Sequence, residues 1–379
     1  MIKVAIVTKK MVIGGTEKAL LPMLKQFDSE KFVVDLYLQE LGGALYDEIP
    51  SYVNVIKMPI FSELTLFNKF RQPFYFFKAI LNRLQINSDP EYYLQCERAC
   101  KCMPRVKKEY DIAISYHAPD AVPFFYVINN LYAKKKIMWL HFDVEKTNAV
   151  NDTAKKYFSC YDKIFAVSEQ SKNTFDRNYP EMAGKTEVFY NLVDTESIRK
   201  KATLGPTYND VFSGIRILSI GRLDEQKGYD LLVPVIKKLL DENYDIKCYI
   251  CGDGNQYSNL KRLIIEKKVE NNFLLLGMQS NPYGYLKDCD VYVQPSRNEG
   301  YCTTTNEARM FYKPILVTDV CGMREQITDH VNGTIVDLNT AAIYKGLKEL
   351  LDHPELRKAY SEQLQELDLN RTIDIERLL

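Results

Sequence analysis

The sequence predicts an α/β protein with two doubly wound, mostly parallel sheets. The chain has 379 residues, and because domains average ~150 residues, two or three domains are expected. Short apolar runs typical of buried strands alternate with helical patterns along the chain, an order that favours parallel sheets. Residues 2–7 and 215–220 are two such runs, and each leads into a glycine-containing loop and then a helical pattern. This arrangement brings backbone N–H groups close to a phosphate in many α/β proteins.

Composition narrows the class of protein. Hydrophobic residues make up 46% and charged residues 26% of a chain with zero formal net charge, as in an ordinary globular protein, and no nucleic-acid recognition motif occurs. The nine cysteines follow no framework spacing, which indicates a reducing compartment. The sequence contains neither an apolar run near the ~18 residues of a membrane span nor a signal-peptide pattern. We therefore expect a cytoplasmic protein, either soluble or peripheral on the inner face of the cell membrane.

The N-terminal half carries two glycines and a histidine where a ligand is expected. Gly14 and Gly15 follow the strand at 2–7 and precede a helical pattern, without the full spacing of a dinucleotide-binding fingerprint. His141 ends another predicted strand, and ligands of open α/β sheets collect at the carboxyl ends of strands. The alternative is a structural histidine, and His117 is a weaker candidate of the same kind. The other strands of this half are expected at 32–38, 53–57, 111–115, 136–141, 163–167 and 187–190.

A loop in the C-terminal half combines glycines with two cations. Arg222 and Lys227 lie between Gly221 and Gly228, directly after a predicted strand and before a helix. A diphosphate suits this loop because a helix N-terminus attracts anions and both side chains are cationic. Two exposed loop cations are the alternative.

The other elements of the C-terminal half follow from its apolar patterns. Before the cation loop we expect an interdomain connection over 195–213. After it we expect strands at 249–251, 273–277, 291–294, 315–318 and 333–336, and helices at 229–240, 256–267, 283–288, 341–351 and from 354 toward 379.

A second loop of this half carries a carboxylate next to a predicted anion site. Glu299 follows the strand at 291–294, and a short helix is predicted over 307–312 because Pro314 must end it. Free N–H groups at the start of a helix attract phosphate. Glu307, as a helical side chain, leans toward that end. The two carboxylates are therefore expected to hold different parts of one phosphorylated ligand, unless this is an ordinary βαβ unit with solvated glutamates.

Several of these motifs occur together in a known family. Glu299 and Glu307 have an E-x7-E spacing, preceded by Pro-Ser and followed by Ala. Residues 221–228 read Gly-Arg-Leu…Lys-Gly, and residues 191–194 read Asn-Leu-Val-Asp, with Leu192 where the family has glycine. The sequence thereby resembles the GT4 family of retaining glycosyltransferases, in particular the bacterial enzymes of capsular and exopolysaccharide synthesis. The resemblance is close in the C-terminal half and loose in the N-terminal half.

The resemblance implies a GT-B fold, in which two Rossmann-like domains face each other across a cleft. An acceptor-side domain is then expected at 1–195, with 360–379 crossing back onto it, and a donor-binding domain at 196–359. Leu364, Leu367 and Leu378 are expected to supply the buried face of the returning stretch. The implied reaction is transfer of a sugar from a nucleotide-diphosphate donor to a hydroxyl of a saccharide or lipid-linked acceptor, in cell-surface polysaccharide synthesis. UDP is the expected nucleotide, and retention of anomeric configuration is what the family implies.

The same resemblance gives four residues catalytic roles. Arg222 and Lys227 are expected to stabilise charge on the leaving diphosphate, which is usually the largest contribution to such catalysis. Glu299 is expected to contact the donor sugar. His141 resembles the active-site histidine of many family members and is expected near the donor sugar or the acceptor.

The remaining site residues are expected to bind the donor. Glu307 would hold the ribose hydroxyls, and the helix start near Tyr301 would offer N–H groups to phosphate. Cys302 stands where the family often has a second glycine, which leaves the choice of donor sugar open. The full set of further donor contacts is Gly14, Gly15, Gly252, Met278, Gln279, Tyr301, Cys302, Thr303 and Thr304.

Two other readings of the site remain open. One is a GT-B nucleotide-sugar epimerase, and the other is a nucleotide-sugar-binding subunit without catalysis in a glycosyltransferase complex. The motif residues expected in an enzyme are all present, which favours catalysis: Arg222, Lys227, Glu299, Glu307 and His141. Product analysis with a labelled UDP-sugar, with and without acceptor, separates the three readings.

Residues 57–108 differ from the rest of the chain. They contain ten Lys or Arg against four Asp or Glu, interleaved with aromatic residues. Such a segment can contact an anionic membrane surface or a lipid-linked acceptor. A core with a solvated basic face is the alternative.

No metal or other cofactor is expected besides the nucleotide-sugar co-substrate. Asp288 and Asp290 form an Asp-x-Asp string, which holds a divalent metal in some glycosyltransferases of another fold. The pair lies at the amino end of a predicted strand, opposite the end where ligands collect. We therefore interpret both residues as structural.

Overall fold

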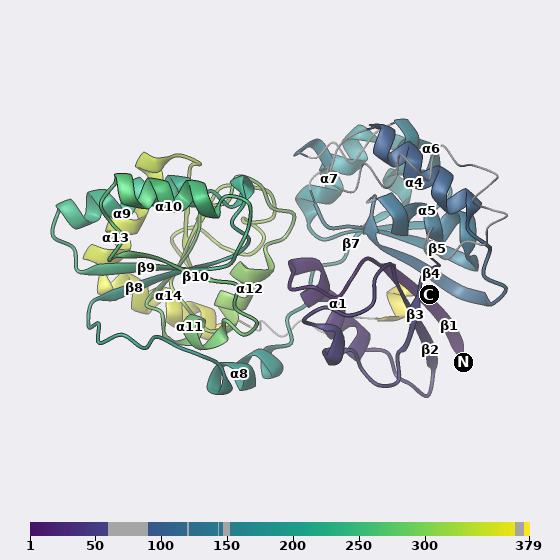
Figure 1. The fold of residues 1–379 in the computed structure, drawn as a ribbon, viewed down its shortest axis with the longest axis horizontal. Helices are drawn as coiled ribbons and strands as arrows, with labels where there is room; N and C mark the ends of the chain where they lie inside the picture. Colours follow the sequence, from purple (N-terminus) through teal and green to yellow (C-terminus); the bar gives the residue numbers. More distant parts are fainter. Residues whose placement is uncertain (60–89, 120, 143, 147–151, 368–374) are drawn as a thin grey trace. The chain divides into compact units, whose positions relative to one another are not determined.

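The computed structural model describes residues 1–59, 90–119, 121–142, 144–146, 152–367 and 375–379 (Figure 1). They form two compact units, each with its own sheet. The first unit runs from Met1 to Leu192 and includes the last residues of the chain, whereas the second unit begins at Val193. None of the described helices combines the length and the apolar composition that crossing a membrane requires.

The sheet of the first unit has seven parallel strands in the order β3-β2-β1-β4-β5-β6-β7. An interior strand of this sheet is β1 (Ile2–Thr8), where Val4 pairs with Val34 on one side and Ile112 on the other. From Val4 onward β1 is buried, as expected for a parallel strand with both faces covered. The other strands are β2 (Phe32–Leu38), β3 (Asn54–Lys57), β4 (Glu109–Ala118), β5 (Tyr132–Leu140), β6 (Lys163–Ala166) and β7 (Thr186–Val188).

Aromatic side chains fill much of the core of the first unit. Phe124 stacks on Tyr161 with ring centroids 5.2 Å apart, and Phe125 and Phe158 pack in the same cluster. These rings come mainly from helices that follow β4 and β5. The helices of this unit are α1 (Gly15–Lys25), α4 (Pro90–Cys102), α5 (Ala121–Asn130), α6 (Asp152–Phe158) and α7 (Glu169–Asn178).

The sheet of the second unit has six parallel strands in the order β10-β9-β8-β11-β12-β13. The order runs outward from β8 in one direction and then from β11 in the other, which is the arrangement of a Rossmann fold with its switch point between β8 and β11. The strands are β8 (Ile215–Ile220), β9 (Ile246–Cys251), β10 (Phe273–Gly277), β11 (Val291–Gln294), β12 (Ile315–Thr318) and β13 (Thr334–Val336).

Helices cover both faces of this second sheet. Val291 and Val293 of β11 pack in one apolar cluster, and Tyr292 between them packs in another, because successive side chains of a strand point to opposite faces. The first cluster includes side chains of α9 (Tyr229–Asp241), α10 (Tyr257–Glu266), α13 (Thr340–Asp352) and α14 (Pro354–Glu366), and the second those of α8 (Thr195–Leu204), α11 (Tyr283–Asp288) and α12 (Thr303–Met310). The prediction of two doubly wound parallel sheets is therefore confirmed.

Two sequence predictions in the second unit are wrong. Residues 195–213 were expected to be a connection, but α8 forms there because Asp194 accepts a hydrogen bond from the Ser197 backbone at 2.9 Å and Ile198 is buried. The helix expected over 307–312 is α12, which begins at Thr303. A threonine run has modest helix propensity, and tertiary packing decides its conformation here.

The last described residues pack on the first unit. Arg377 donates to the Val188 carbonyl at 2.8 Å, and Lys163 donates to the Arg377 carbonyl at 3.0 Å. Leu378 is fully buried there. Leu364 was expected on the first unit as well, but it lies in the core of the second unit, because α14 continues through this position. Leu367, also expected in the buried face, is exposed.

Candidate functional site

Two loops of the second unit meet at the switch point of its sheet. The loop after β8 contains Gly228, whose φ of 69° lies in the left-handed region that glycine tolerates. A Cβ atom at Gly228 would lie 2.0 Å from the Pro295 carbonyl oxygen, in the loop after β11. Gly252, at the end of β9, is equally constrained, since its Cβ would lie 1.8 Å from the Gly221 carbonyl oxygen. Glycine at these positions therefore lets three loops approach one another at the carboxyl edge of the sheet.

Lys227 and Glu299 form an ion pair between the first two loops. Lys227 Nζ lies 2.7 Å from Glu299 Oε1, and both side chains are largely buried. Burial by itself disfavours the ammonium ion, but the carboxylate of Glu299 more than offsets this and raises the pKa of Lys227. Ser296 also donates to Glu299 Oε1, at 2.6 Å. The pair thus presents a fixed positive charge beside a fixed negative charge.

Arg222 lies on the same loop but in a different environment. Its guanidinium contacts Asp224 Oδ2 at 3.0 Å, and the side chain is 67% exposed. Asp224 also accepts a hydrogen bond from the Lys227 backbone N–H at 3.2 Å. One carboxylate therefore shapes the loop that carries both cations, while Arg222 remains accessible to a ligand.

The start of α12 is held by side-chain contacts to the backbone. Gln326 accepts from the Cys302 N–H at 3.2 Å and donates to the Cys302 carbonyl at 2.8 Å. The Cys302 thiol is buried, and this burial, followed by the charge of Glu299, raises its pKa. Tyr301 and Thr303 are buried as well, and the Thr304 hydroxyl donates to Gln294 at 3.2 Å. The predicted phosphate contacts therefore lie on a rigid helix start.

Glu307 occupies the middle of α12 and is only 2% exposed. Tyr283 of α11 donates a hydrogen bond to its Oε1 at 2.9 Å. The two predicted carboxylates thus stand on one segment, with different partners and different neighbours.

Three of the expected donor contacts, Gly252, Met278 and Gln279, lie at the ends of β9 and β10. The Gly252 N–H donates to the Gly277 carbonyl at 2.9 Å, which aligns these strand ends. Met278 follows and is 56% exposed, and Gln279 donates to the Leu276 carbonyl at 2.8 Å. An exposed apolar side chain at this edge suits a flat base.

The first unit has its own polar cluster at its switch point between β1 and β4. His117 Nδ1 lies 2.7 Å from the Thr8 hydroxyl, and Nε2 lies 3.4 Å from Glu17 Oε1. Glu17, in the first turn of α1, is folded under the glycine loop, because a Cβ on Gly14 would lie 2.3 Å from its Oε2. Gly14 and Gly15 therefore cover a buried carboxylate and a histidine.

His141 follows β5 in the same unit. Its ring lies 4.7 Å from the Tyr116 ring and 6.2 Å from the His117 ring, measured between centroids. Burial and the neighbouring His117 lower the pKa of His141 well below the usual value, against a smaller opposing effect of the Tyr116 backbone. Both ring nitrogens are buried, and neither has a well-aligned hydrogen-bond partner among the described residues. Buried polar atoms without partners are costly and often mark a ligand site.

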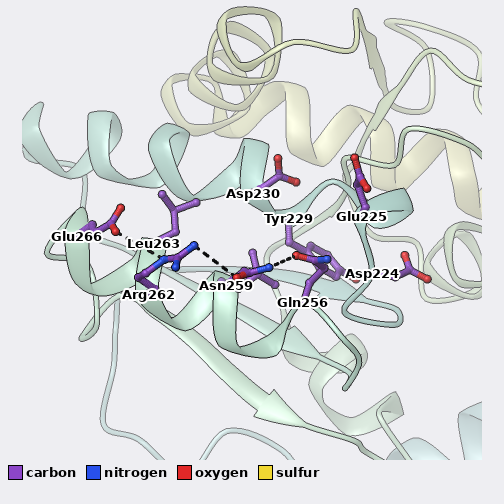
Figure 2. A pocket seen from close by; sticks show the side chains of 10 residues that line it. Asp224, Glu225, Tyr229, Asp230, Gln256, Asn259, Arg262, Leu263 and Glu266 are labelled. Carbon is purple, nitrogen blue, oxygen red and sulfur yellow. Dashed lines mark hydrogen bonds and ion pairs between the residues drawn. The ribbon is translucent and has the colours of Figure 1, made fainter. Parts of the chain in front are cut away.

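A surface groove of about 540 Å³ lies between the start of α9 and the length of α10. Along α10, Gln256, Asn259, Arg262 and Glu266 form a row of hydrogen bonds and ion pairs (Figure 2). Four carboxylates and one guanidinium line the groove, so it repels a diphosphate. The two loops with Lys227 and Glu299 are the better anion site.

The Asp-x-Asp string has structural contacts. Asp288 accepts from the Thr207 hydroxyl at 2.6 Å, and Asp290 accepts from the Arg216 backbone N–H at 2.8 Å. Both aspartates therefore hold neighbouring segments of the polypeptide at the amino ends of the strands.

Five contact residues were not singled out from the sequence. Ser296 belonged to a recognised Pro-Ser motif, and Glu17 stands in the first helical turn after Gly-Gly, so both left a signal. Gln294, Tyr283 and Gln326 left none, because their roles depend on which strands and helices become neighbours.

The comparisons with known proteins agree with this geometry. The family model described as "Glycosyl transferases group 1" matches residues 213–367. The chain is 33% identical over 208 residues to the N-acetylgalactosamine-N,N'-diacetylbacillosaminyl-diphospho-undecaprenol 4-alpha-N-acetylgalactosaminyltransferase of Campylobacter jejuni. This match covers 54% of the chain and 55% of that protein, so the chain spans about half the length of the curated relative it matches.

Solved structures resemble the whole chain. HepE of Anabaena, in complex with UDP and glucose, has a TM-score of 0.71 at 16% identity, covering 100% of this chain and 97% of that one. TarM of S. aureus, in a complex that includes UDP, has a TM-score of 0.70 at 14% identity, covering 97% and 96%. These likenesses confirm the predicted GT-B fold.

Proposed function

We propose that the protein is a retaining glycosyltransferase, because residues 213–367 match the family model of the group 1 glycosyl transferases. It moves a sugar from a nucleotide-diphosphate donor, with UDP as the expected nucleotide, to a hydroxyl of a saccharide or lipid-linked acceptor. The observation that carries the proposal is the buried Lys227–Glu299 pair at the switch point of the second sheet. It supplies a cation for phosphate and a carboxylate for sugar hydroxyls within one site.

The chemistry follows from the charges of the site. Breaking the bond between sugar and phosphate leaves negative charge on the diphosphate, and Lys227 and Arg222 stabilise it. The N–H groups at the start of α12 add to this effect. Glu307 accepts hydrogen bonds from the ribose hydroxyls, and Glu299 accepts them from the donor sugar.

His141 contributes as a neutral ring. Because its pKa is well below the usual value, the imidazole is uncharged at neutral pH. It then offers one hydrogen-bond donor and one acceptor to a hydroxyl of the sugar or the acceptor.

Product analysis tests this proposal. A UDP-sugar labelled in the sugar is incubated with the protein, with and without candidate acceptors. Labelled product that forms only with an acceptor supports transfer. An epimerised UDP-sugar without acceptor indicates the epimerase instead, and binding without any conversion indicates a non-catalytic subunit.

The proposed class of acceptor is based on the name of a relative. The Campylobacter protein is named for a diphospho-undecaprenol substrate, and we propose a lipid-linked saccharide acceptor for this chain, at the inner face of the cell membrane. The segment 57–108 is the proposed membrane contact, although residues 60–89, which hold seven of its nine aromatic and four of its ten basic side chains, lie outside the described residues.

Vesicle flotation tests the membrane contact. Salt-sensitive binding to anionic vesicles, lost when Lys69, Arg71 and Lys78 are replaced, supports it. No binding to anionic vesicles contradicts it and leaves the proposed transfer reaction untouched.

A further inference from the structure

A chain of buried polar side chains leads from the sheet to Glu299. Tyr292, Gln294 and Ser296 are alternate residues from β11 onward, and all three are fully buried. The Tyr292 hydroxyl lies 2.6 Å from Gln294 Oε1, and Gln294 Nε2 lies 2.8 Å from Ser296 Oγ. Ser296 Oγ lies 2.6 Å from Glu299 Oε1. Four side chains are thus connected by three short contacts beneath the candidate site.

Hydrogen-bonding capacity fixes the direction of every bond in this chain. The ionised carboxylate of Glu299 can only accept, so Ser296 must donate its single proton to it. Ser296 must then accept from Gln294, which places the amide nitrogen toward Ser296. The amide oxygen of Gln294 consequently accepts from Tyr292 and, at 3.2 Å, from the Thr304 hydroxyl. Gln294 therefore connects this row of hydrogen-bonded side chains to the first turn of α12.

This row of hydrogen-bonded side chains holds one carboxylate oxygen of Glu299 and not the other. Oε1 receives hydrogen bonds from Ser296 and from Lys227, at 2.6 and 2.7 Å. Two donors on one oxygen fix the rotation of the carboxylate group. Among the described residues, no hydrogen bond or ion pair engages Oε2.

We propose that Gln294 and Ser296 are positioning residues that hold Glu299 so that Oε2 accepts a hydroxyl of the donor sugar. This inference rests on the proposed function. It predicts that both residues act on recognition of the sugar and on kcat, and that Ser296, whose side chain contacts Glu299 directly, leaves recognition of the nucleotide unchanged. A purely structural role would affect UDP and UDP-sugar alike.

The test compares binding of UDP with binding of a UDP-sugar by calorimetry. The sugar is chosen from UDP-glucose, UDP-galactose and their N-acetylamino forms as the one that raises the Tm of the wild type most. Ser296→Ala leaves the Kd of UDP within about two-fold and reduces the advantage of the UDP-sugar over UDP about ten-fold, since the charged acceptor Glu299 loses a donor. Gln294→Met, which removes the donor to Ser296, reduces this advantage as well.

Two controls separate positioning from stability. Thr334→Val removes another buried hydroxyl of the second unit, which contacts Tyr360 Oη at 3.1 Å, and leaves the ratio of the two Kd values unchanged. In a Glu299→Ala background, Ser296→Ala has no further effect on that ratio, because its only route to the sugar is gone.

The outcomes are distinguishable. If the wild type binds no nucleotide-sugar, the proposed function fails and this inference fails with it. If the wild type binds one, and Ser296→Ala either weakens UDP equally or keeps its effect in the Glu299→Ala background, only this inference is overturned.

Discussion

Lys227 and Glu299 are 72 residues apart in the sequence, yet their side chains meet at 2.7 Å. They meet because β8 and β11 are paired neighbours in the sheet, and each residue lies in the loop after one of them. Both loops end at the same edge, on either side of the switch point. The pair therefore ties the geometry of the site directly to the topology of the fold.

Breaking this pair should cost stability as well as activity. We expect Lys227→Met to lower the free energy of unfolding by about 3 kcal/mol, because Glu299 is left as an uncompensated, largely buried charge. Urea unfolding measures it. The double variant Lys227→Met/Glu299→Gln should lose less than the sum of the two single variants. Additive losses would contradict a coupled pair.

Arg222→Ala should show the opposite combination of effects. Because Arg222 is 67% exposed and Asp224 keeps its hydrogen bond from the Lys227 N–H, the free energy of unfolding should change by less than about 0.5 kcal/mol. The catalytic efficiency with a UDP-sugar should fall by about 100-fold, through the lost phosphate contact. Arg262, on α10 and similarly exposed, is the matched control, and Arg262→Ala should retain wild-type efficiency. Equal activities of the two variants would show that the diphosphate does not bind at Arg222.

Tyr283→Phe should weaken binding of the nucleotide through Glu307. The variant removes the hydroxyl that donates to Glu307 Oε1, so the carboxylate loses its orientation toward the ribose. We expect a loss of about 1 kcal/mol in UDP binding by calorimetry. Binding of 2′,3′-dideoxy-UDP, which lacks both hydroxyls, should be equally weak in wild type and variant. An equal loss for both ligands would show that Tyr283 acts elsewhere.

The stability of the first unit should depend on pH through His141. Its pKa is lowered from 6.5 on folding, so the unfolded state binds more protons below about pH 6.5. Stability is therefore complete above that pH and falls as the pH drops, by up to about 1.4 kcal/mol per pH unit. Fluorescence of Trp139, the single tryptophan of the chain, follows urea unfolding of this unit.

Histidine variants test this pH dependence. His141→Asn should show a shallower slope of stability between about pH 5 and 6.5 than the wild type. His353→Asn, an exposed site in the second unit, should keep the wild-type slope. His117 faces the same ring, so His117→Asn should raise the pKa of His141 and flatten the slope in part. Identical slopes in wild type and His141→Asn would show that His141 is charged in the folded state.

Transfer should proceed without a divalent metal. Arg222 and Lys227 supply the positive charge for the diphosphate, and Asp288 and Asp290 are engaged in contacts at the opposite ends of the strands. We expect the rate in excess EDTA to stay within two-fold of the untreated rate. Loss of activity in EDTA that Mn²⁺ or Mg²⁺ restores would show that the two side chains are insufficient.

The sequence predicted much of the fold because strands of a parallel sheet are continuous apolar runs. The boundaries of β2, β8, β10, β11 and β12 agree with the predicted ranges. The helical pattern predicted α12 only from Glu307, whereas the helix begins at Thr303, where Gln326 hydrogen-bonds the backbone of Cys302. The fate of Leu364 depended on which unit α14 contacts, and periodicity does not contain that information.

The candidate site was predictable where a residue stands in a recognisable motif. Arg222, Lys227, Glu299 and Glu307 all lie in the second unit, where the motifs placed them. Their partners were not predictable: Tyr283 reaches Glu307 only because α11 and α12 cover the same face of the sheet. Glu17 illustrates the same limit, since its contact with His117 joins α1 to a strand 100 residues further along the chain.

Calorimetric titration of UDP tests the central claim most directly, that the switch point of the second sheet is a nucleotide-diphosphate site. The account predicts that the wild type binds UDP in excess EDTA, that uridine binds at least ten-fold more weakly, and that Arg222→Ala removes most of this difference. No binding of UDP by the wild type, or an Arg222→Ala variant that still prefers UDP over uridine to the same degree, would contradict it.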